Sequence, residues 1–309
     1  MTGTFILSLD TEIAWGTYTH LEKRAPAFNH YPALLHRLIN QLNIFEISAT
    51  WAVVGHLLLH PDESTSVPQP HYKFAATPDS HRINHHPPEW FRAPYVADAI
   101  QNMRQPQDVG SHTFTHILAD QVSRELFAAQ LAEVVRIHAE KELPPPRSLV
   151  YPQNRIAHTD LLPEYGFITY RGIAQDWYNA LPGPLRRPAH LLDRTLGIAP
   201  PTYAPADCLQ PDGLVNLPAS QFLMSYDGVR ARIPTAARVQ QASRGLQQAI
   251  QRGEIFHLWF HPFNLGSSDD MFDALAQILA MVWQARERGL LRVQTMTETA
   301  AGIIGFQPR

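Results

Sequence analysis

Two histidines, His112 and His116, carry the clearest chemistry in the sequence. They follow a short β-prone segment, 107–111, and their four-residue spacing predicts both imidazoles on one face of a helical turn. Neutral imidazole is a preferred ligand of zinc and similar divalent ions. With one carboxylate, the pair would form a metal site with open positions for water and substrate. The alternative is a chance spacing of two surface histidines, since the chain contains 16 His.

Two carboxylates, Asp10 and Glu12, lie at the end of the first β-prone segment, 4–9. Side chains two residues apart in a strand point to the same side. Both should therefore project from the carboxyl end of this strand, where active sites of parallel α/β folds lie. One carboxylate could act as a base and the other as a metal ligand. A turn or capping role is the alternative for an aspartate at a strand end.

A further histidine, His261, ends the hydrophobic segment 255–260, and Pro262 stops the strand there. A histidine at the carboxyl end of a strand can protonate a leaving group near neutral pH. His257 lies further back on the same strand, so we expect a buried, hydrogen-bonded structural role for it.

Arg155 follows another short strand, 148–151, and could orient a catalytic carboxylate through a bidentate contact. Arg171, which follows segment 167–170, is a competing candidate for this role. For either arginine, an ordinary surface salt bridge is the alternative.

These residues need a scaffold that brings several strand ends together, and the chain alternates β-prone with helical segments. The predicted strands are 4–9, 48–54, 107–111, 148–151, 167–170, 214–217, 255–260 and 291–294, and the predicted helices are 31–42, 124–141, 236–251 and 271–288. This alternation predicts an α/β fold with a mostly parallel sheet, open or closed into a barrel. Residues 57–95 and 179–213 interrupt it, and we expect long ordered loops there, either over the substrate end of the sheet or as surface decoration.

Length and composition are those of a globular protein that forms either one large domain or two. The 309 residues are 45% hydrophobic and 17% charged, and we expect a single domain over residues 1–309. The net charge of −3 argues against nucleic acid as a partner. Cys208 is the only cysteine, so no intrachain disulfide can form. With no signal-peptide pattern and no transmembrane-length apolar run, the expected location is cytoplasmic.

Five motifs occur in the order typical of one family. They are Ser-Leu-Asp-Thr-Glu at 8–12, Ser-Ala-Thr-Trp-Ala-Val-Val-Gly at 48–55, Gly-Ser-His-Thr-Phe-Thr-His at 110–116, Tyr-Pro-Gln-Asn-Arg at 151–155 and His-Leu-Trp-Phe-His-Pro-Phe-Asn at 257–264. The set resembles the polysaccharide deacetylases of the NodB-homology superfamily, similar to carbohydrate esterase family 4. The resemblance implies a distorted (β/α)7 barrel with one divalent metal, usually zinc. It also implies His112 and His116 as metal ligands, Asp10 as the catalytic base and His261 as the catalytic acid.

One position departs from the commonest family pattern. Most members have two adjacent aspartates in the first motif, and the second of them binds the metal, whereas this chain has Thr11 there. A branch of the superfamily uses Asp-x-Asp, so Glu12 is the expected third ligand.

The resemblance implies a metal-dependent hydrolase that removes an N-acetyl or other N-acyl group from a sugar or glycan precursor, in surface-polysaccharide biosynthesis. A deformylase or small-amide C–N hydrolase of the same superfamily is the first alternative. A catalytically inactive carbohydrate-binding relative is the second, and Thr11 motivates it. A zinc peptidase would need an H-E-x-x-H helix, which the sequence lacks.

Overall fold

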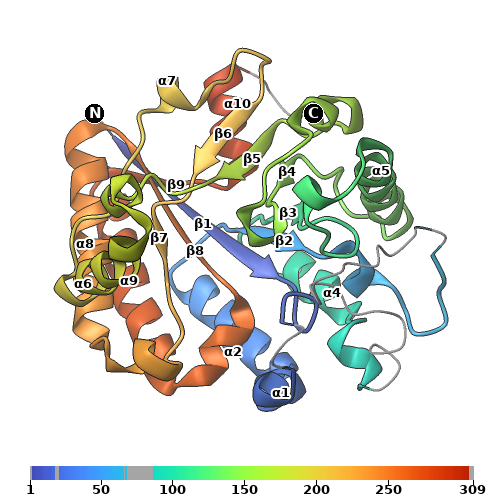
Figure 1. Cartoon of the computed structure of the whole chain (residues 1–309), viewed down its shortest axis with the longest axis horizontal. Coiled ribbons are helices and arrows are strands. Elements are labelled where there is room, and N and C mark those ends of the chain that lie inside the picture. Colours follow the sequence, from blue (N-terminus) through green and yellow to red (C-terminus); the bar gives the residue numbers. More distant parts are fainter. Residues whose placement is uncertain (1, 18–20, 66, 68–85, 306–309) are drawn as a thin grey trace.

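The computed structural model describes residues 2–17, 21–65, 67 and 86–305, and these build one parallel β-sheet surrounded by helices (Figure 1). Its strands are β1 (Gly3–Thr11), β2 (Thr50–Val53), β3 (Asp108–Ser111), β4 (Ser148–Leu149), β5 (Thr169–Gly172), β6 (Val215–Pro218), β7 (Gln221–Phe222), β8 (Ile255–Phe260) and β9 (Leu291–Val293). They pair in the order β6-β5-β4-β3-β2-β1-β8-β7, and β9 pairs with the start of β1. The predicted mostly parallel sheet is confirmed.

The sheet closes into a barrel through one short segment. β6 and β7 stand at opposite ends of the strand order, yet only Ala219 and Ser220 separate them in the chain. The Ala219 amide donates to the carbonyl of Gly172 on β5 (3.0 Å), and the Ser220 amide donates to the carbonyl of His257 on β8 (2.8 Å). Segment 215–222 therefore passes from one edge of the sheet to the other and acts as a single strand of the barrel. Together with β1 to β5 and β8, this segment gives the barrel seven strands, as in the predicted distorted (β/α)7 barrel.

Helices cover the outside of the barrel (Figure 1). They are α1 (Leu21–Asn29), α2 (Tyr31–Ile44), α4 (Tyr95–Gln101), α5 (Arg124–Glu140), α6 (Gly183–Leu196), α7 (Pro205–Cys208), α8 (Thr235–Arg252), α9 (Asp269–Glu287) and α10 (Met296–Ile304). The apolar periodicity predicted α2, α5, α8 and α9 to within two residues at each end, because each lays a hydrophobic stripe against the barrel. All nine residues of β1 are buried, as expected for a parallel strand with both faces covered. No helix among the described residues is long and apolar enough to cross a membrane.

The prediction of a loop over 179–213 was wrong, because α6 and α7 lie within it. Its prolines suggested irregular structure, but Pro184 occupies the first turn of α6, where its missing N–H costs no hydrogen bond. In the described part of 57–95, the chain forms the end of a 3-10 turn, a second one over Pro88–Trp90 and the start of α4. Residues 66 and 68–85 of that predicted loop lie outside the described residues.

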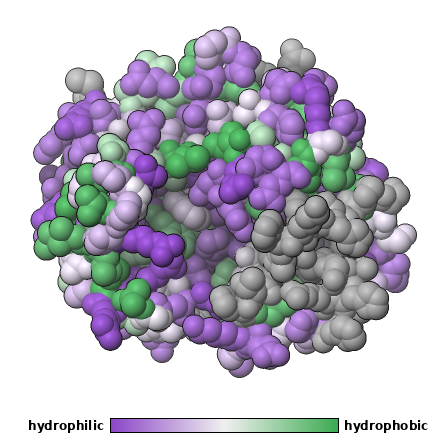
Figure 2. Space-filling view, in the orientation of Figure 1, coloured by the Kyte–Doolittle hydropathy of each residue, from purple (hydrophilic) through white to green (hydrophobic). Residues whose placement is uncertain are grey.

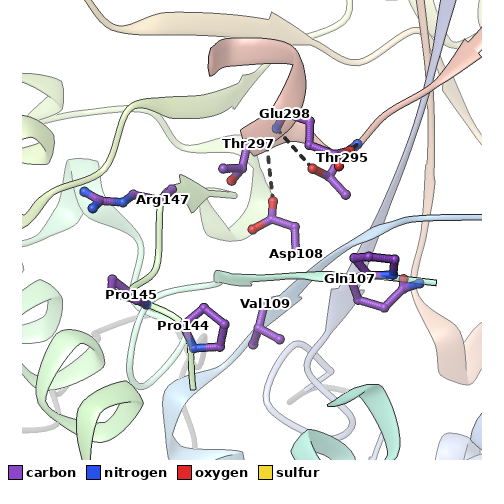
Figure 3. A pocket seen from close by; sticks show the side chains of 10 residues that line it. Gln107, Asp108, Val109, Pro144, Pro145, Arg147, Thr295, Thr297 and Glu298 are labelled. Atoms are coloured by element: carbon purple, nitrogen blue, oxygen red, sulfur yellow. Dashed lines mark hydrogen bonds between the residues drawn. The ribbon is translucent and has the colours of Figure 1, made fainter. Parts of the chain in front are cut away.

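The amino ends of the strands are joined to α10 by a half-buried carboxylate, that of Asp108 (Figure 3). Asp108 Oδ2 accepts hydrogen bonds from Thr50 Oγ1 (2.9 Å), Ser148 Oγ (2.8 Å) and the Thr297 amide (3.4 Å). Burial raises the pKa of Asp108 above its ordinary value. A cavity of about 220 Å³ adjoins this junction. Asp108 thus ties three elements together at the end of the barrel opposite the predicted site.

Candidate metal centre and catalytic pocket

The carboxyl ends of β1, β3, β5 and β8 converge on a cavity of about 180 Å³. Its lining consists of polar and aromatic residues from these strand ends and the loop after β4: Asp10, Glu12, Gly16, His112, His116, Gln153, Asn154, Arg171, Trp259 and His261. Five of the six residues predicted to form the site are therefore brought together. The sixth, Arg155, does not line this cavity.

Glu12, His112 and His116 form a compact, buried group of metal-ligand type. Glu12 Oε2 lies 2.9 Å from His116 Nε2 and 3.2 Å from His112 Nε2, and the three ligand atoms all lie within 4.8 Å of one another. His112 Nδ1 donates to the carbonyl of Val150 (2.8 Å). A carbonyl oxygen can only accept, so the proton of neutral His112 is on Nδ1 and its Nε2 lone pair faces Glu12. This donor set fits one divalent cation.

The charge balance of this group favours an ionised carboxylate. Burial alone would raise the pKa of Glu12, but positive charge on His261 and His116, and the hydrogen bonds that His112 and His116 donate when doubly protonated, hold it well below its ordinary value. Burial lowers the pKa of His116, and Glu12 opposes that shift. An anionic oxygen beside neutral imidazole nitrogens is the state in which such residues bind a metal.

The two histidines do not lie on a helical turn, so that part of the prediction was wrong. Residues 112–116 form an irregular loop after β3, with left-handed backbone at Thr113 (φ 60°) and His116 (φ 55°). The imidazoles still face each other, with ring centroids 4.8 Å apart. Left-handed backbone is costly for residues other than glycine, and such strain is concentrated at functional sites.

A tight turn after β1 makes room for Glu12. The chain reverses at Ile13, which has left-handed backbone (φ 47°), and the Trp15 amide donates to the Glu12 carbonyl (2.8 Å). This turn brings Gly16 against the Glu12 carboxylate, where a Cβ atom would overlap the carboxyl group. Thr11 Oγ1 instead donates to the carbonyl of Leu9 (3.2 Å). Glu12, not Thr11, thus faces the histidines.

Arg171 clamps the second carboxylate of the site. Its NH1 and NH2 groups donate to Asp10 Oδ1 (2.5 Å) and Oδ2 (2.7 Å), and both side chains are buried. Burial raises the pKa of Asp10, but Arg171 outweighs this effect and the net pKa is lowered. Arg155 lies on the surface, where its Nε donates to Asp120 (2.8 Å). The bidentate contact considered for Arg155 is thus made by the competing candidate, Arg171.

A hydrogen-bonded layer beneath Asp10 holds Arg171 in place. Ser8 Oγ accepts from Arg171 NH1 (3.1 Å) and lies 2.8 Å from His257 Nε2. His257 Nδ1 donates to the Leu217 carbonyl (3.3 Å), so its Nε2 accepts the Ser8 hydroxyl proton. Burial lowers the pKa of His257 to about 3, which keeps it neutral. This is the buried structural role expected for His257.

His261 is oriented by Asn264, a residue of its own motif without an assigned role, and by Arg24 of α1. Arg24 NH1 donates to Asn264 Oδ1 (3.2 Å), which turns the Asn264 amide group toward His261 Nδ1 (3.3 Å). An amide NH₂ only donates, so Nδ1 accepts and the proton of neutral His261 is on Nε2. That atom lies 3.4 Å from Glu12 Oε1 and 3.9 Å from Asp10 Oδ2. The His261 proton therefore points into the pocket.

The barrel is similar to several solved structures at low sequence identity. A Mycobacterium smegmatis protein assigned as a polysaccharide deacetylase gives a TM-score of 0.62 at 16% identity, over 100% of this chain and 94% of that one. A Pseudomonas aeruginosa PAO1 protein with the same assignment gives 0.58 at 11%, over 96% and 88%. The PuuE allantoinase gives 0.58 at 12%, over 99% and 91%. No protein-family model and no curated protein matches the sequence. The chain thus shares the barrel fold of these two proteins assigned as polysaccharide deacetylases, the fold that its motifs predicted.

Proposed function

We propose that the protein is a metal-dependent hydrolase that removes an N-acyl group, such as acetyl, from a sugar or glycan precursor. The observation that carries this proposal is the convergence of a Glu-His-His group with a clamped carboxylate and a proton-bearing histidine in one small pocket. These are the groups that amide hydrolysis requires: ligands for a Lewis acid, a base for water and an acid for the departing amine.

Glu12, His112 and His116 would hold the metal, and zinc suits this set because it prefers histidine and carboxylate ligands. A bound zinc ion would polarise the acyl carbonyl and lower the pKa of the attacking water. His112 is fixed for this role by its hydrogen bond to Val150, which orients the imidazole before any ligand arrives.

Asp10 is assigned as the base that takes the proton of the attacking water. Arg171 keeps Asp10 ionised and fixes its orientation, but it also lowers the basicity of the carboxylate. A base with a lowered pKa acts efficiently only on a water that is itself acidified. The Asp10–Arg171 pair and the neighbouring metal ligands therefore make one functional unit.

His261 is assigned as the acid that protonates the departing amine. Its Nε2–H points into the pocket, held by the contact of Nδ1 with Asn264. Its side chain is partly exposed, unlike those of Asp10 and Glu12, so it can regain a proton from solvent after each cycle. The acid and the base come from the ends of the neighbouring strands β8 and β1, with His261 Nε2 3.9 Å from Asp10 Oδ2.

The substrate assignment draws on the fold and on the pocket. The similar structures assigned as polysaccharide deacetylases support an acylated sugar, and a cavity of about 180 Å³ suits an acyl group with the remainder of the substrate outside. The similarity to an allantoinase supports a second candidate, hydrolysis of a small amide. A panel of N-acetyl sugars, N-formyl sugars and allantoin separates the two candidates by which substrate is consumed.

The test measures bound metal and acyl release together. We expect His112→Ala to lose both, and His36→Ala, an exposed histidine of α2, to change neither. Retention of both metal and activity by His112→Ala would contradict the proposal. Tight metal binding by the wild type without turnover of any substrate in the panel would instead indicate an inactive carbohydrate-binding relative.

A further inference from the structure

Helix α6 turns its polar side toward the protein. Asp193 and Arg194 are buried, and Asp193 accepts from Trp177 Nε1 (2.7 Å) and Gln241 Nε2 (3.1 Å). Arg194 NH1 donates to Gln241 Oε1 (2.9 Å). Hydrogen bonds rather than apolar packing thus fasten this helix to α8 and to the preceding turn.

The opposite side of α6 presents leucines to solvent. Leu185, Leu192 and Leu196 recur at the seven- and four-residue spacings of one helix face, and Leu191 lies beside them. Between 43% and 54% of each of these leucines is exposed. Apolar side chains gather over α6 at the left of the space-filling view (Figure 2). A surface helix of a globular protein normally turns its apolar side to the core and its polar side to solvent. The exposed leucine face of α6 is therefore of the kind that binds another molecule or a membrane.

The exposed charged residues of α6 and of the 3-10 helix Gly228–Arg232 are all positive. Arg186 and Arg187 lie on α6, and Arg230 and Arg232 lie on the 3-10 helix Gly228–Arg232, whose Arg230 is close enough to act on the charge of His190 in α6. Neither helix has an exposed carboxylate. The chain as a whole has a net charge of −3, so this local cationic excess runs against its composition.

We propose that the α6 face docks on an anionic lipid bilayer surface. A leucine face flanked by arginines is the pattern of a helix that lies in the membrane interface, with its apolar side chains among the acyl chains and its guanidinium groups at the headgroups. A second copy of the chain fits less well. A two-fold contact would bring four arginines against four, with no exposed carboxylate of these helices to pair with them.

Docking by this face would bring the catalytic pocket close to the membrane. The chain leaves the pocket at Arg171, and two exposed apolar residues, Ile173 and Trp177, lead from there into α6. The 3-10 helix that contains exposed Val229 follows β7, which pairs with the strand that ends at His261. The chain thus enters both α6 and this 3-10 helix from the pocket end of the barrel, and docking there would suit a substrate presented at the bilayer surface.

The experiment is co-sedimentation with vesicles of phosphatidylglycerol and phosphatidylcholine, compared with vesicles of phosphatidylcholine alone. We expect wild type to bind the anionic vesicles, and added salt to weaken that binding. L185S/L192S/L196S should lose it, and R186Q/R187Q should weaken it by about fivefold per arginine. Ile44→Ser on α2 and Arg104→Gln alter equally exposed residues elsewhere and should bind as wild type does. All of these residues are exposed, so melting temperatures should stay unchanged.

Two results would overturn this proposal without touching the hydrolase assignment. One is equal sedimentation of wild type and the triple serine variant. The other is a wild-type dimer, measured by light scattering without vesicles, that the triple serine variant converts to a monomer, because the leucines would then face a second copy. Activity of the variants on a soluble substrate should match that of wild type, which separates a docking defect from a catalytic one.

Discussion

Replacement of Gly16 by alanine tests whether Glu12 is the third metal ligand. Gly16 does not have positive-φ backbone, so alanine is tolerated there by the main chain. The added Cβ would meet three atoms of the Glu12 carboxyl group, all closer than 3.0 Å. The substitution therefore acts first on the Glu12 carboxylate, which supplies the three nearest atoms.

The expected displacement is large on the scale of metal coordination. Ordinary contacts between such atoms are about 3.5 Å, so the carboxylate must move by more than about 0.5 Å. Ligand distances in metal sites are kept within about 0.2 Å. We therefore expect Gly16→Ala to weaken zinc affinity at least about 100-fold, the upper end of what loss of a supporting contact around a ligand costs. Competition with a chromogenic chelator measures this affinity without reference to turnover.

A shorter acid provides the matching rescue. In the double variant E12D/G16A, the aspartate withdraws from the added methyl group, so we expect tighter zinc binding than with Gly16→Ala alone. Gly302→Ala in α10 is the control, because a Cβ there meets nothing within 4 Å. Wild-type zinc affinity in Gly16→Ala would refute the assignment of Glu12 as a ligand held in place by Gly16.

Three further predictions test the rest of the structure. Arg171→Met should leave Asp10 buried and unpaired and so raise its pKa, which should lower kcat/KM by about 100-fold or more and move the acid limb of the pH profile to higher pH. Arg155→Met, which alters a surface arginine, should match wild type. Equal losses of activity in the two variants would contradict the assignment. His257 and His56 have pKa values lowered by burial to about 3 and about 4, so the unfolded chain binds protons that the folded chain does not. As pH falls from about 6.5 to about 4, urea titrations of the metal-free protein should show the free energy of unfolding fall by about 1.4 kcal/mol per pH unit for each histidine, and His56→Gln should remove one of the two contributions. Asp108→Ala should lower the free energy of unfolding by about 1–3 kcal/mol, because it leaves three hydrogen-bond donors unpaired. Asp108→Asn should cost less, because its amide oxygen still accepts. Equal urea midpoints for the two variants would exclude Asp108 as the acceptor that joins these strands to α10.

The sequence predicted the scaffold where short-range patterns report burial. Strand β8 has the predicted bounds, 255–260, because its hydrophobic run is interrupted by Pro262. The predicted site residues at the ends of β1, β3 and β8 meet because parallel strands bring their carboxyl ends to one side. That argument needs only the direction of each strand, which the strand–helix alternation supplies.

The choice between two arginines could not be made from the sequence, because it depends on how the barrel curves. Arg171 belongs to β5 itself and pairs in register with Leu217, so it points from the barrel wall toward Asp10. Arg155 follows left-handed backbone at Gln153 and Asn154, which turns the chain outward before the arginine is reached. The sequence places both arginines after a strand and cannot distinguish these two paths.

Strained backbone is concentrated around the pocket. Of the eight non-glycine residues with positive φ among those described, five line the pocket or adjoin its lining: Ile13, Thr113, His116, Gln153 and Asn154. Each costs of order 1–3 kcal/mol, which selection for stability alone would remove by replacement with glycine or by a relaxed turn. His116, a metal-ligand candidate, and Thr113, a β-branched residue, both have left-handed backbone in the loop after β3. Their concentration around Glu12 is consistent with a site whose side-chain placement outweighs the stability it costs.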